Sequence, residues 1–179
     1  PINIKNTNRP EDRGTMIVPS ATDYDSKHVI TGVAGLRGFS AITVEKDRMN
    51  SEVGFIRRVL EVFEENEISI EHVPSGIDTI SVVLETKTLD AVRERLLTRI
   101  QRSARPDSIA VEDELALIAV VGRGMVKAKG TSARVFDAIS AAGVNIKMID
   151  QGSSELNIIV GIEERDFEKA LTAIYNEFV

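Results

Sequence analysis

Hydrophobic residues recur along this chain at two different spacings, which predict an alternation of strands and helices. Between Ser40 and Glu45 apolar and polar residues alternate and β-branched residues are frequent, as in a half-buried strand. The next apolar residues recur every three or four positions and predict an amphipathic helix that ends near Asn66: Phe55, Ile56, Val59, Leu60 and Phe63. Strands at 68–73 and 79–84, a helix over 89–100 and a strand at 108–111 follow. The predicted order is βαββαβ.

The same pattern then occurs a second time. The stretch 40–86 recurs without a gap 76 positions later, at 116–162, and predicts strands at 115–121, 144–149 and 156–162 with helices at 131–142 and 166–178. Equivalent positions include Ile42 and Ile118, Met49 and Met125, Gly54 and Gly130, Val59 and Val135, Gly76 and Gly152, Ile80 and Leu156, Val82 and Ile158, and Asp90 and Asp166. Such a repeat indicates two duplicated units that bury their hydrophobic faces together.

The second unit ends before its fourth strand, while an extra strand at 29–34 has no place in the first unit. Because an unpaired sheet edge is a liability, we expect this strand to cross over and complete the second sheet. The predicted class is α+β, with two ferredoxin-like βαββαβ units, antiparallel sheets and helices on one face. Residues 40–112 form the first unit, inserted into a second unit made of 28–39 and 113–179. Side-by-side joining of the two sheets would give an eight-stranded surface.

Composition excludes several classes of function. The net charge of -6 argues against a nucleic-acid partner. The chain has no Cys, and its only histidines, His28 and His72, are far apart, so we expect no metal site. No apolar run approaches a membrane span and no signal peptide is evident, so we expect a cytoplasmic protein with no membrane partner. The chain begins at Pro1 without Met, and we interpret it as a C-terminal piece of a longer protein or a processed product.

No catalytic constellation stands out, and the loop between the first strand and first helix of each unit is the best candidate for chemistry. In the second unit this loop is glycine-rich, from Gly122 to Gly130, but it lacks the GxGxxG and GxxxxGK[ST] patterns of nucleotide sites. It is interpreted either as a simple connection in which Gly130 permits close approach, or as a small-ligand loop. In the second case free amide groups at the helix N-terminus would bind an anion such as an amino-acid carboxylate.

The first unit strengthens the small-ligand interpretation. The loop from Met49 to Phe55 places polar groups and a helix start at one end of the sheet, beside the strand residues 69–71. If the helix start held a carboxylate and Glu71 faced a cationic side chain, the site would suit a basic amino acid. Glu71 is equally compatible with an exposed acidic residue on a strand.

Several strings within this duplication resemble the tandem ACT domains in the C-terminal regulatory region of aspartate kinase (aspartokinase). They are residues 30–34, 39–49 and 54–55, the run 69–84 that contains Pro74-Ser75-Gly76, and residues 145–149. Residues 1–27 resemble the tail of the kinase domain and its connector. The resemblance implies a dimer of paired ACT units that binds feedback effectors, lysine alone or with threonine, at interfaces between units. It also implies that the parent enzyme phosphorylates aspartate with ATP and magnesium, on the pathway to lysine, threonine and methionine.

The same resemblance assigns effector-binding residues by motif. In the first unit they are Met49, Glu52, Gly54, Phe55, Ile56, Ser69, Ile70, Glu71, Ser75 and Gly76. In the second unit they are Gly130, Thr131, Asn145 and Ile146. No catalytic residue, metal ligand or cofactor is expected in this chain itself, which would regulate the kinase domain of the same enzyme. Two alternatives stay open: a free-standing amino-acid-binding module or separate regulatory subunit, and an enzyme that uses the glycine loop on a phosphorylated substrate.

Overall fold

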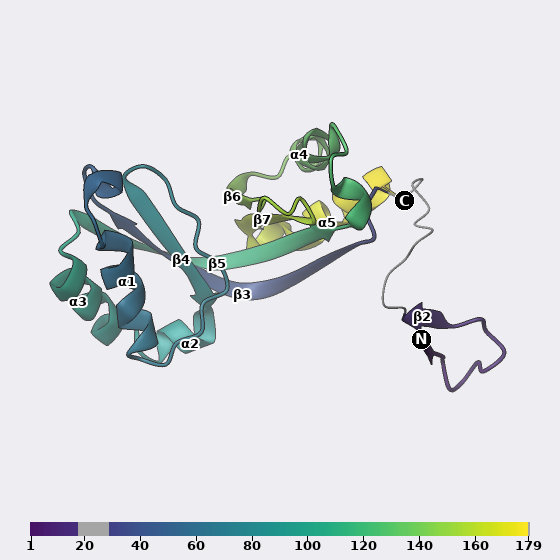
Figure 1. Cartoon of the computed structure of the whole chain (residues 1–179), viewed down its shortest axis with the longest axis horizontal. Helices are drawn as coiled ribbons and strands as arrows, with labels where there is room; N and C mark the ends of the chain where they lie inside the picture. Colours follow the sequence, from purple (N-terminus) through teal and green to yellow (C-terminus); the bar gives the residue numbers. More distant parts are fainter. Residues whose placement is uncertain (18–28, 179) are drawn as a thin grey trace.

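Two long antiparallel strands organise the computed structural model of the chain, which describes residues 1–17 and 29–178 (Figure 1). Strands β3 (Gly32–Glu45) and β5 (Ser108–Val121) pair along their whole length, from Gly32 opposite Val121 to Glu45 opposite Ser108. They lie in a five-stranded antiparallel sheet of order β4-β3-β5-β7-β6, with β4 (Thr79–Glu85), β6 (Ile146–Asp150) and β7 (Asn157–Glu163). The two strands therefore run through both halves of the molecule.

Each half has its own helices and its own core. In the first unit the short helix η1 (Met49–Ser51) and helices α1 (Phe55–Glu64), α2 (Thr86–Asp90) and α3 (Arg93–Ala104) accompany β4 and the adjoining halves of β3 and β5. In the second unit η2 (Arg123–Met125), α4 (Thr131–Ala141), η3 (Glu164–Asp166) and α5 (Phe167–Phe178) accompany β6, β7 and the other halves. Two separate hydrophobic clusters fill the space between sheet and helices, one per unit. The two copies of the repeated sequence therefore form two equivalent hydrophobic cores.

The crossover strand completes the second sheet, as the sequence predicts. The first half of β3 pairs with the second half of β5, which pairs on its other side with β7. The predicted α+β class with the first unit inserted into the second is confirmed. The expected side-by-side junction of two sheets is wrong, because β3 and β5 run continuously from one unit into the other. The sequence predicts four short strands where the structure has these two long ones.

A bulge in each long strand explains how both cores can lie on one side of the sheet. Val33 and Ile42 both pack against helices, although they are nine positions apart and a regular strand would place them on opposite faces. The pairing register shifts between Arg37 and Ala41, where Gly38 has φ 86° and Glu114, on the partner strand, has φ 57°. One extra residue in each strand shifts the alternation of its side chains by one position, so that the apolar side chains beyond the bulge again face the helices.

A polar cluster fixes this bulged region to the first unit. The fully buried Ser40 donates a hydrogen bond of 2.6 Å to Asp113, and its Oγ lies 2.9 Å from the hydroxyl of Thr86. Arg93 contacts both carboxylate oxygens of Asp113 and also pairs with Asp90. Hydrogen bonds from Arg93 and then Ser40 lower the pKa of Asp113 below its ordinary value. The junction of the units is thus held by side chains from strands and helices together.

The gapless repeat holds only as far as the hairpin that precedes β4 and β7. Beyond it the buried residues match at an offset of 78, so that Ile80 corresponds to Ile158 and Val82 to Val160. The pairs Ile80 with Leu156, Val82 with Ile158 and Asp90 with Asp166 are therefore wrong. The second unit has two more residues in this hairpin, and a shift of two leaves the strand alternation unchanged, which concealed it in the sequence.

Other elements differ locally from the prediction. Residues 68–73 do not form a regular strand, but they pair with β4 where His72 lies opposite Val83. The helix predicted over 89–100 is split into α2 and α3. Near the N-terminus, β1 (Ile2–Ile4) and β2 (Thr15–Ile17) form an exposed hairpin. His28 and much of the predicted connector lie outside the described residues.

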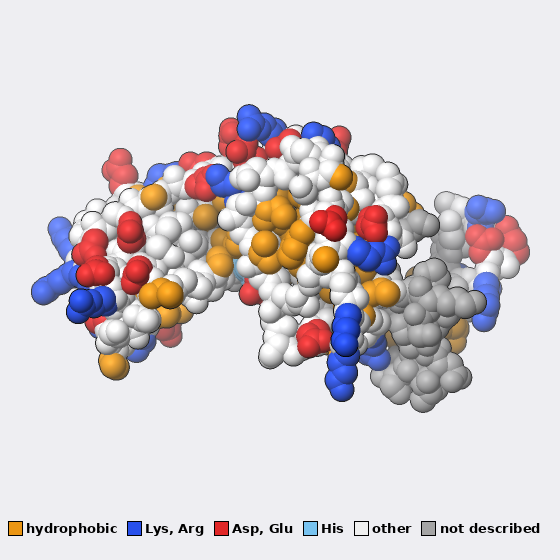
Figure 2. Space-filling model, turned by 90° about the horizontal axis from the view of Figure 1, so that it is seen from above, with side chains coloured by type: hydrophobic (Ala, Val, Ile, Leu, Met, Phe, Trp, Pro, Cys, Tyr) orange, Lys and Arg blue, Asp and Glu red, His pale blue; other side chains and the backbone are white. Residues whose placement is uncertain are grey.

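Charged side chains of both signs lie in scattered groups on the face shown in Figure 2, and apolar side chains gather near its middle. No described helix is long and apolar enough to cross a membrane. Within residues 1–17 and 29–178, no group of three or more His, Asp or Glu side chains is arranged to hold a metal ion.

Candidate effector-binding site

A glycine in the left-handed conformation starts the first long helix of each unit. Gly54 has φ 81° and Gly130 has φ 87°, and each carbonyl accepts the first helical hydrogen bond at 3.0 Å, from Arg58 and Arg134 respectively. No side chain caps the first turn of either helix. The amide groups at these starts are therefore not satisfied by a cap and form the part of each unit best suited to bind a carboxylate.

Gly130 is needed for its backbone angle and not for close approach, because a Cβ at this position would meet nothing within 4 Å. Close approach occurs instead at Gly122, at the beginning of the same loop. A Cβ there would lie 2.5 Å from the carbonyl oxygen of Val29. The glycine-rich loop is thus built to pack against the segment that enters β3 and to turn into α4.

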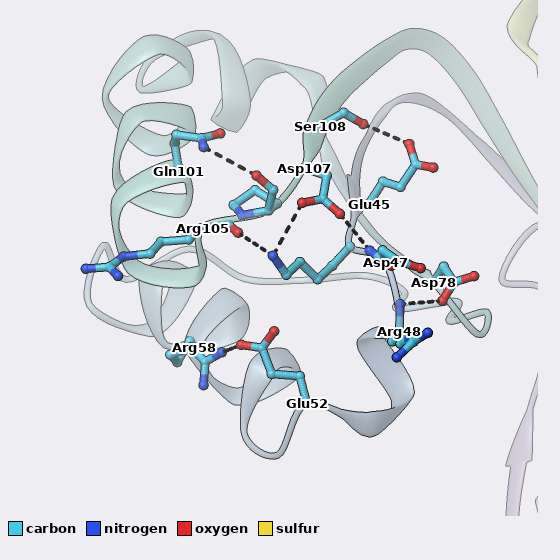
Figure 3. A network of polar contacts seen from close by, with 12 residues as sticks. Glu45, Asp47, Arg48, Glu52, Arg58, Asp78, Gln101, Arg105, Asp107 and Ser108 are labelled. Carbon is cyan, nitrogen blue, oxygen red and sulfur yellow. Dashed lines mark hydrogen bonds and ion pairs between the residues drawn. The ribbon is translucent and has the colours of Figure 1, made fainter.

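A network of polar contacts holds the first-unit loop in place (Figure 3). Asp107 accepts a hydrogen bond of 2.7 Å from the backbone N–H of Asp47 and pairs with Lys46 at 3.3 Å. On the other side, Asp78 accepts a hydrogen bond of 3.0 Å from the backbone N–H of Arg48. These contacts connect the loop to the start of β5 and to the turn before β4. The loop that precedes the helix is therefore conformationally restricted, and it holds the helix start in a fixed position.

We expect Asp107→Ala to loosen this loop without unfolding the unit. Its hydrogen bond with the backbone of Asp47, and then that with Lys46, lower the pKa of Asp107 from 3.8. A carboxylate with a lowered folded-state pKa stabilises the folded loop above its ordinary pKa and loses that effect as the pH falls through the lowered value. Amide exchange of Asp47 and Arg48, followed by NMR at neutral pH, should accelerate. Asp137→Ala on the exposed face of α4 is the control, and equal exchange in both variants would contradict this role.

The predicted first-unit residues separate into three groups. Met49 and Phe55 are almost fully buried in the core and support the loop from below. Ile56 and Ile70 line one shallow groove beside α1, while Ser69 and Glu71 are exposed on the adjacent segment and Glu52 pairs with Arg58. Ser75 and Gly76 line a different cavity, on the face of the sheet that carries no helices. The structure therefore brings Ile56 and Ile70 together but does not bring Ser75 and Gly76 to them.

The known proteins that this chain resembles decide its family. An ACT-domain family model matches residues 118–178. Aspartokinase 3 of Bacillus subtilis is 43% identical over 179 residues, which are 99% of this chain and 39% of the relative. The crystal structure of Clostridium acetobutylicum aspartate kinase superposes with a TM-score of 0.94 at 47% identity, over 99% of this chain and 41% of that one. The chain belongs with the ACT-domain regulatory regions of aspartokinases.

Two more distant structures share the fold. The ligand-free regulatory subunit of aspartate kinase from Thermus thermophilus is 22% identical, with a TM-score of 0.71 over 84% of this chain and 99% of that one. E. coli aspartokinase III in complex with lysine and aspartate is 24% identical, with a TM-score of 0.69 over 85% of this chain and 34% of that one. The present ACT region spans about two fifths of the length of the first two relatives.

In the second ACT unit the candidate residues also lie in different places. Thr131 lies in a shallow pocket beside the start of α4, and Gly130 adjoins it, whereas Asn145 is exposed and Ile146 packs on the core at the start of β6. The pocket also contains residues that the sequence did not single out: Lys127, Lys129, Ser132, Gln151 and Glu155. Of these residues, only Lys127 and Lys129 are marked by a pattern in the sequence, because they lie just before a helix start.

Contacts across this second pocket resemble those of the first unit. Glu155 accepts a hydrogen bond of 2.6 Å from the backbone N–H of Lys127, and Ser132 donates one of 3.0 Å to Gln151. In both ACT units, then, a carboxylate from the hairpin before the third strand holds the loop that precedes the helix. The polar residues of the hairpins could not be aligned from the sequence, because the two hairpins differ in length.

Proposed function

We propose that this chain is the allosteric sensor of an aspartokinase and that it binds lysine, alone or together with threonine, for feedback inhibition. The observation that supports the proposal most strongly is the presence, in each ACT unit, of an uncapped helix start presented by a loop that carboxylates hold in place. E. coli aspartokinase III, which shares this fold, has been solved with lysine bound. Glu71 is exposed and lies on the segment beside the first helix start, where it can face the ammonium of a lysine side chain.

The first-unit groove also suits assembly. It is lined by Ile56, Leu60, Ile68 and Ile70 and lies along the segment 68–73, at the outer side of β4. A strand-like segment with apolar neighbours and a free edge is suited to isologous pairing. In our proposal two chains pair here as a homodimer, and the effector lies at the resulting interface. Binding then shifts the equilibrium between two arrangements of the ACT units. The free energy of this shift cannot exceed the difference between the effector's binding free energies for the two arrangements.

The rest of the proposal concerns the parent enzyme. A kinase domain of the same protein transfers a phosphoryl group from ATP to aspartate with magnesium, and this chain contributes no catalytic residue and no cofactor. We place the enzyme in the cytoplasm, on the pathway to lysine, threonine and methionine. Residues 1–17 and the segment after them connect the sensor to that domain.

The second candidate function is a free-standing amino-acid-binding subunit. The T. thermophilus regulatory subunit supports it, because nearly the whole of that separate chain has this fold. A kinase domain encoded in frame upstream of Pro1 would exclude this alternative. Conversely, phosphorylation of aspartate by the present chain with ATP would contradict the assignment of the chain as a sensor alone.

Thermal unfolding in the presence of amino acids tests the effector. A ligand that binds only the folded state stabilises it by about 2.7 kcal/mol at one hundred times its Kd. We expect lysine to raise Tm, lysine with threonine to raise it more than the sum of the two, and methionine to have no effect. Failure of both lysine and threonine to raise Tm would contradict the proposed effectors.

Glu71→Ala should abolish most of the shift with lysine while leaving Tm without ligand unchanged, because Glu71 is exposed and only its backbone N–H, bonded to Val83 at 2.9 Å, contributes to the sheet. Glu94→Ala, which removes an exposed carboxylate from the first turn of α3, is the matched control. An unchanged response to lysine in Glu71→Ala would remove Glu71 from the site.

A further inference from the structure

The face of the sheet that carries no helices contains a cavity of about 230 Å³ between the two ACT units. Its floor consists of residues from the third hydrophobic cluster: the buried Val83 and Leu115 and the partly buried Ala41, Leu117 and Met148. Since a water molecule occupies about 30 Å³ of liquid, the cavity has room for roughly seven water-sized groups. It is therefore large enough for a small metabolite.

Opposite charges from the two units meet at one side of this cavity. Lys147 of β6 pairs with Glu112 of β5, with Nζ and Oε1 2.5 Å apart, and both residues line the cavity. This contact raises the pKa of Lys147, chiefly through the hydrogen bond with Glu112. Both side chains are partly exposed, so solvent weakens the attraction between them. A ligand can thus separate them at little cost.

Hydroxyl groups occupy the other side. Thr43 and Ser81, on the neighbouring strands β3 and β4, lie 2.9 Å apart through their hydroxyl oxygens. Ser75 lines the cavity from the turn before β4, and Thr79 lines it from the start of that strand. An acid, a base, hydroxyls and an apolar floor in one small space match a molecule with an ammonium group, a carboxylate and a short apolar side chain.

We infer that this cavity is a binding site for a small aliphatic α-amino acid. The ligand's ammonium contacts Glu112, its carboxylate contacts Lys147, and its side chain covers Met148 and Leu117. The site lies within one chain and on the opposite side of the sheet from the helix starts, so it is distinct from the effector site proposed above. A ligand here contacts both ACT units at once. His72 Nε2 also lies 3.2 Å from Asp150 Oδ2 of β6, without forming a hydrogen bond.

The four methionines of the chain provide a reporter for each region. Met148 lines the cavity, Met49 and Met125 lie beneath the loops of the first and second units, and Met16 lies in the N-terminal hairpin. We would titrate the whole chain, labelled at its methionine methyl groups, with L-valine and follow the NMR signals. The expected result is a saturable shift of Met148 that exceeds those of the other three. 3-Methylbutanoate, which lacks the ammonium, and isobutylamine, which lacks the carboxylate, should bind at least about tenfold more weakly.

Lys147→Gln and Glu112→Gln should each weaken valine binding about tenfold or more, because each removes a charged hydrogen-bond partner. Lys87→Gln, which breaks an exposed ion pair with Glu85 elsewhere on the surface, is the control and should bind valine normally. Signals of Met49 and Met125 in the same spectra show that a variant is folded. The inference is overturned if valine leaves Met148 unmoved, or if both cavity variants bind it as well as the control. A separate titration with lysine tests the other site: if lysine leaves the Met49 signal unmoved, the result counts against the proposed effector site and not against this cavity.

Discussion

Phe63→Ala is expected to destabilise the protein by about 3–5 kcal/mol, the usual cost of removing a fully buried aromatic side chain. Phe63 has no exposed surface and lies on α1 in the core of the first ACT unit. Because β3 and β5 carry both cores, the loss should lower the stability of the second unit as well. Denaturation by urea, followed by the methyl signals of Met49 and Met125, should show a single transition at a lower urea concentration for both reporters.

The control for this experiment is Tyr175→Ala on α5, where the aromatic side chain is 53% exposed. Its effect should stay within about 0.5 kcal/mol. If Phe63→Ala removed the native Met49 signal at a urea concentration that left Met125 native, the two ACT units would be independent folding units. That outcome would contradict the cooperativity that the shared strands imply.

Gly122→Ala is expected to cost about 3 kcal/mol, at the upper end of the usual range for overpacking. The added Cβ would lie 2.5 Å from the carbonyl oxygen of Val29, 2.7 Å from Cα of Ile30 and 3.0 Å from the backbone nitrogen of Thr31. All three are backbone atoms of the segment that enters β3, so no side chain can move aside. The strand that completes the second sheet should therefore be displaced. Urea denaturation measures the cost, and faster amide exchange at Thr31, whose N–H donates to Val121 at 2.7 Å, would locate it.

Gly32→Ala is the matched control, because Gly32 lies one residue further along and a Cβ there would meet nothing within 4 Å. Alanine at this extended position should be neutral or slightly stabilising, since glycine has the larger conformational freedom in the unfolded chain. Equal stability of the two variants would show that the segment 29–31 can move without cost and that its packing against Gly122 does not hold the second sheet together.

The candidate effector site shows where sequence reasoning reaches its limit. Gly54 and the helix that follows could be recognised, because hydrophobic spacing and a glycine before a helix are local signals. The contacts of Asp107 and Asp78 with the loop join segments far apart in the chain, and nothing in the local pattern distinguishes these carboxylates from other surface acids. The division of the predicted residues between a groove beside α1 and a cavity on the opposite face is likewise a property of the folded sheet.

By itself the sequence determined the duplication, the α+β class and the insertion of one ACT unit into the other, because buried positions must follow the period of a strand or helix and every sheet edge needs a partner. Only the tertiary structure decided that the units share two continuous strands, that bulges at Gly38 and near Glu114 keep both cores on one side, and that the hairpins differ by two residues. Periodicity cannot resolve these features, since a two-residue shift preserves strand alternation and a bulge is defined by the strand opposite. For the same reason Glu112 and Lys147 could be recognised as partners only once β5 and β6 were folded.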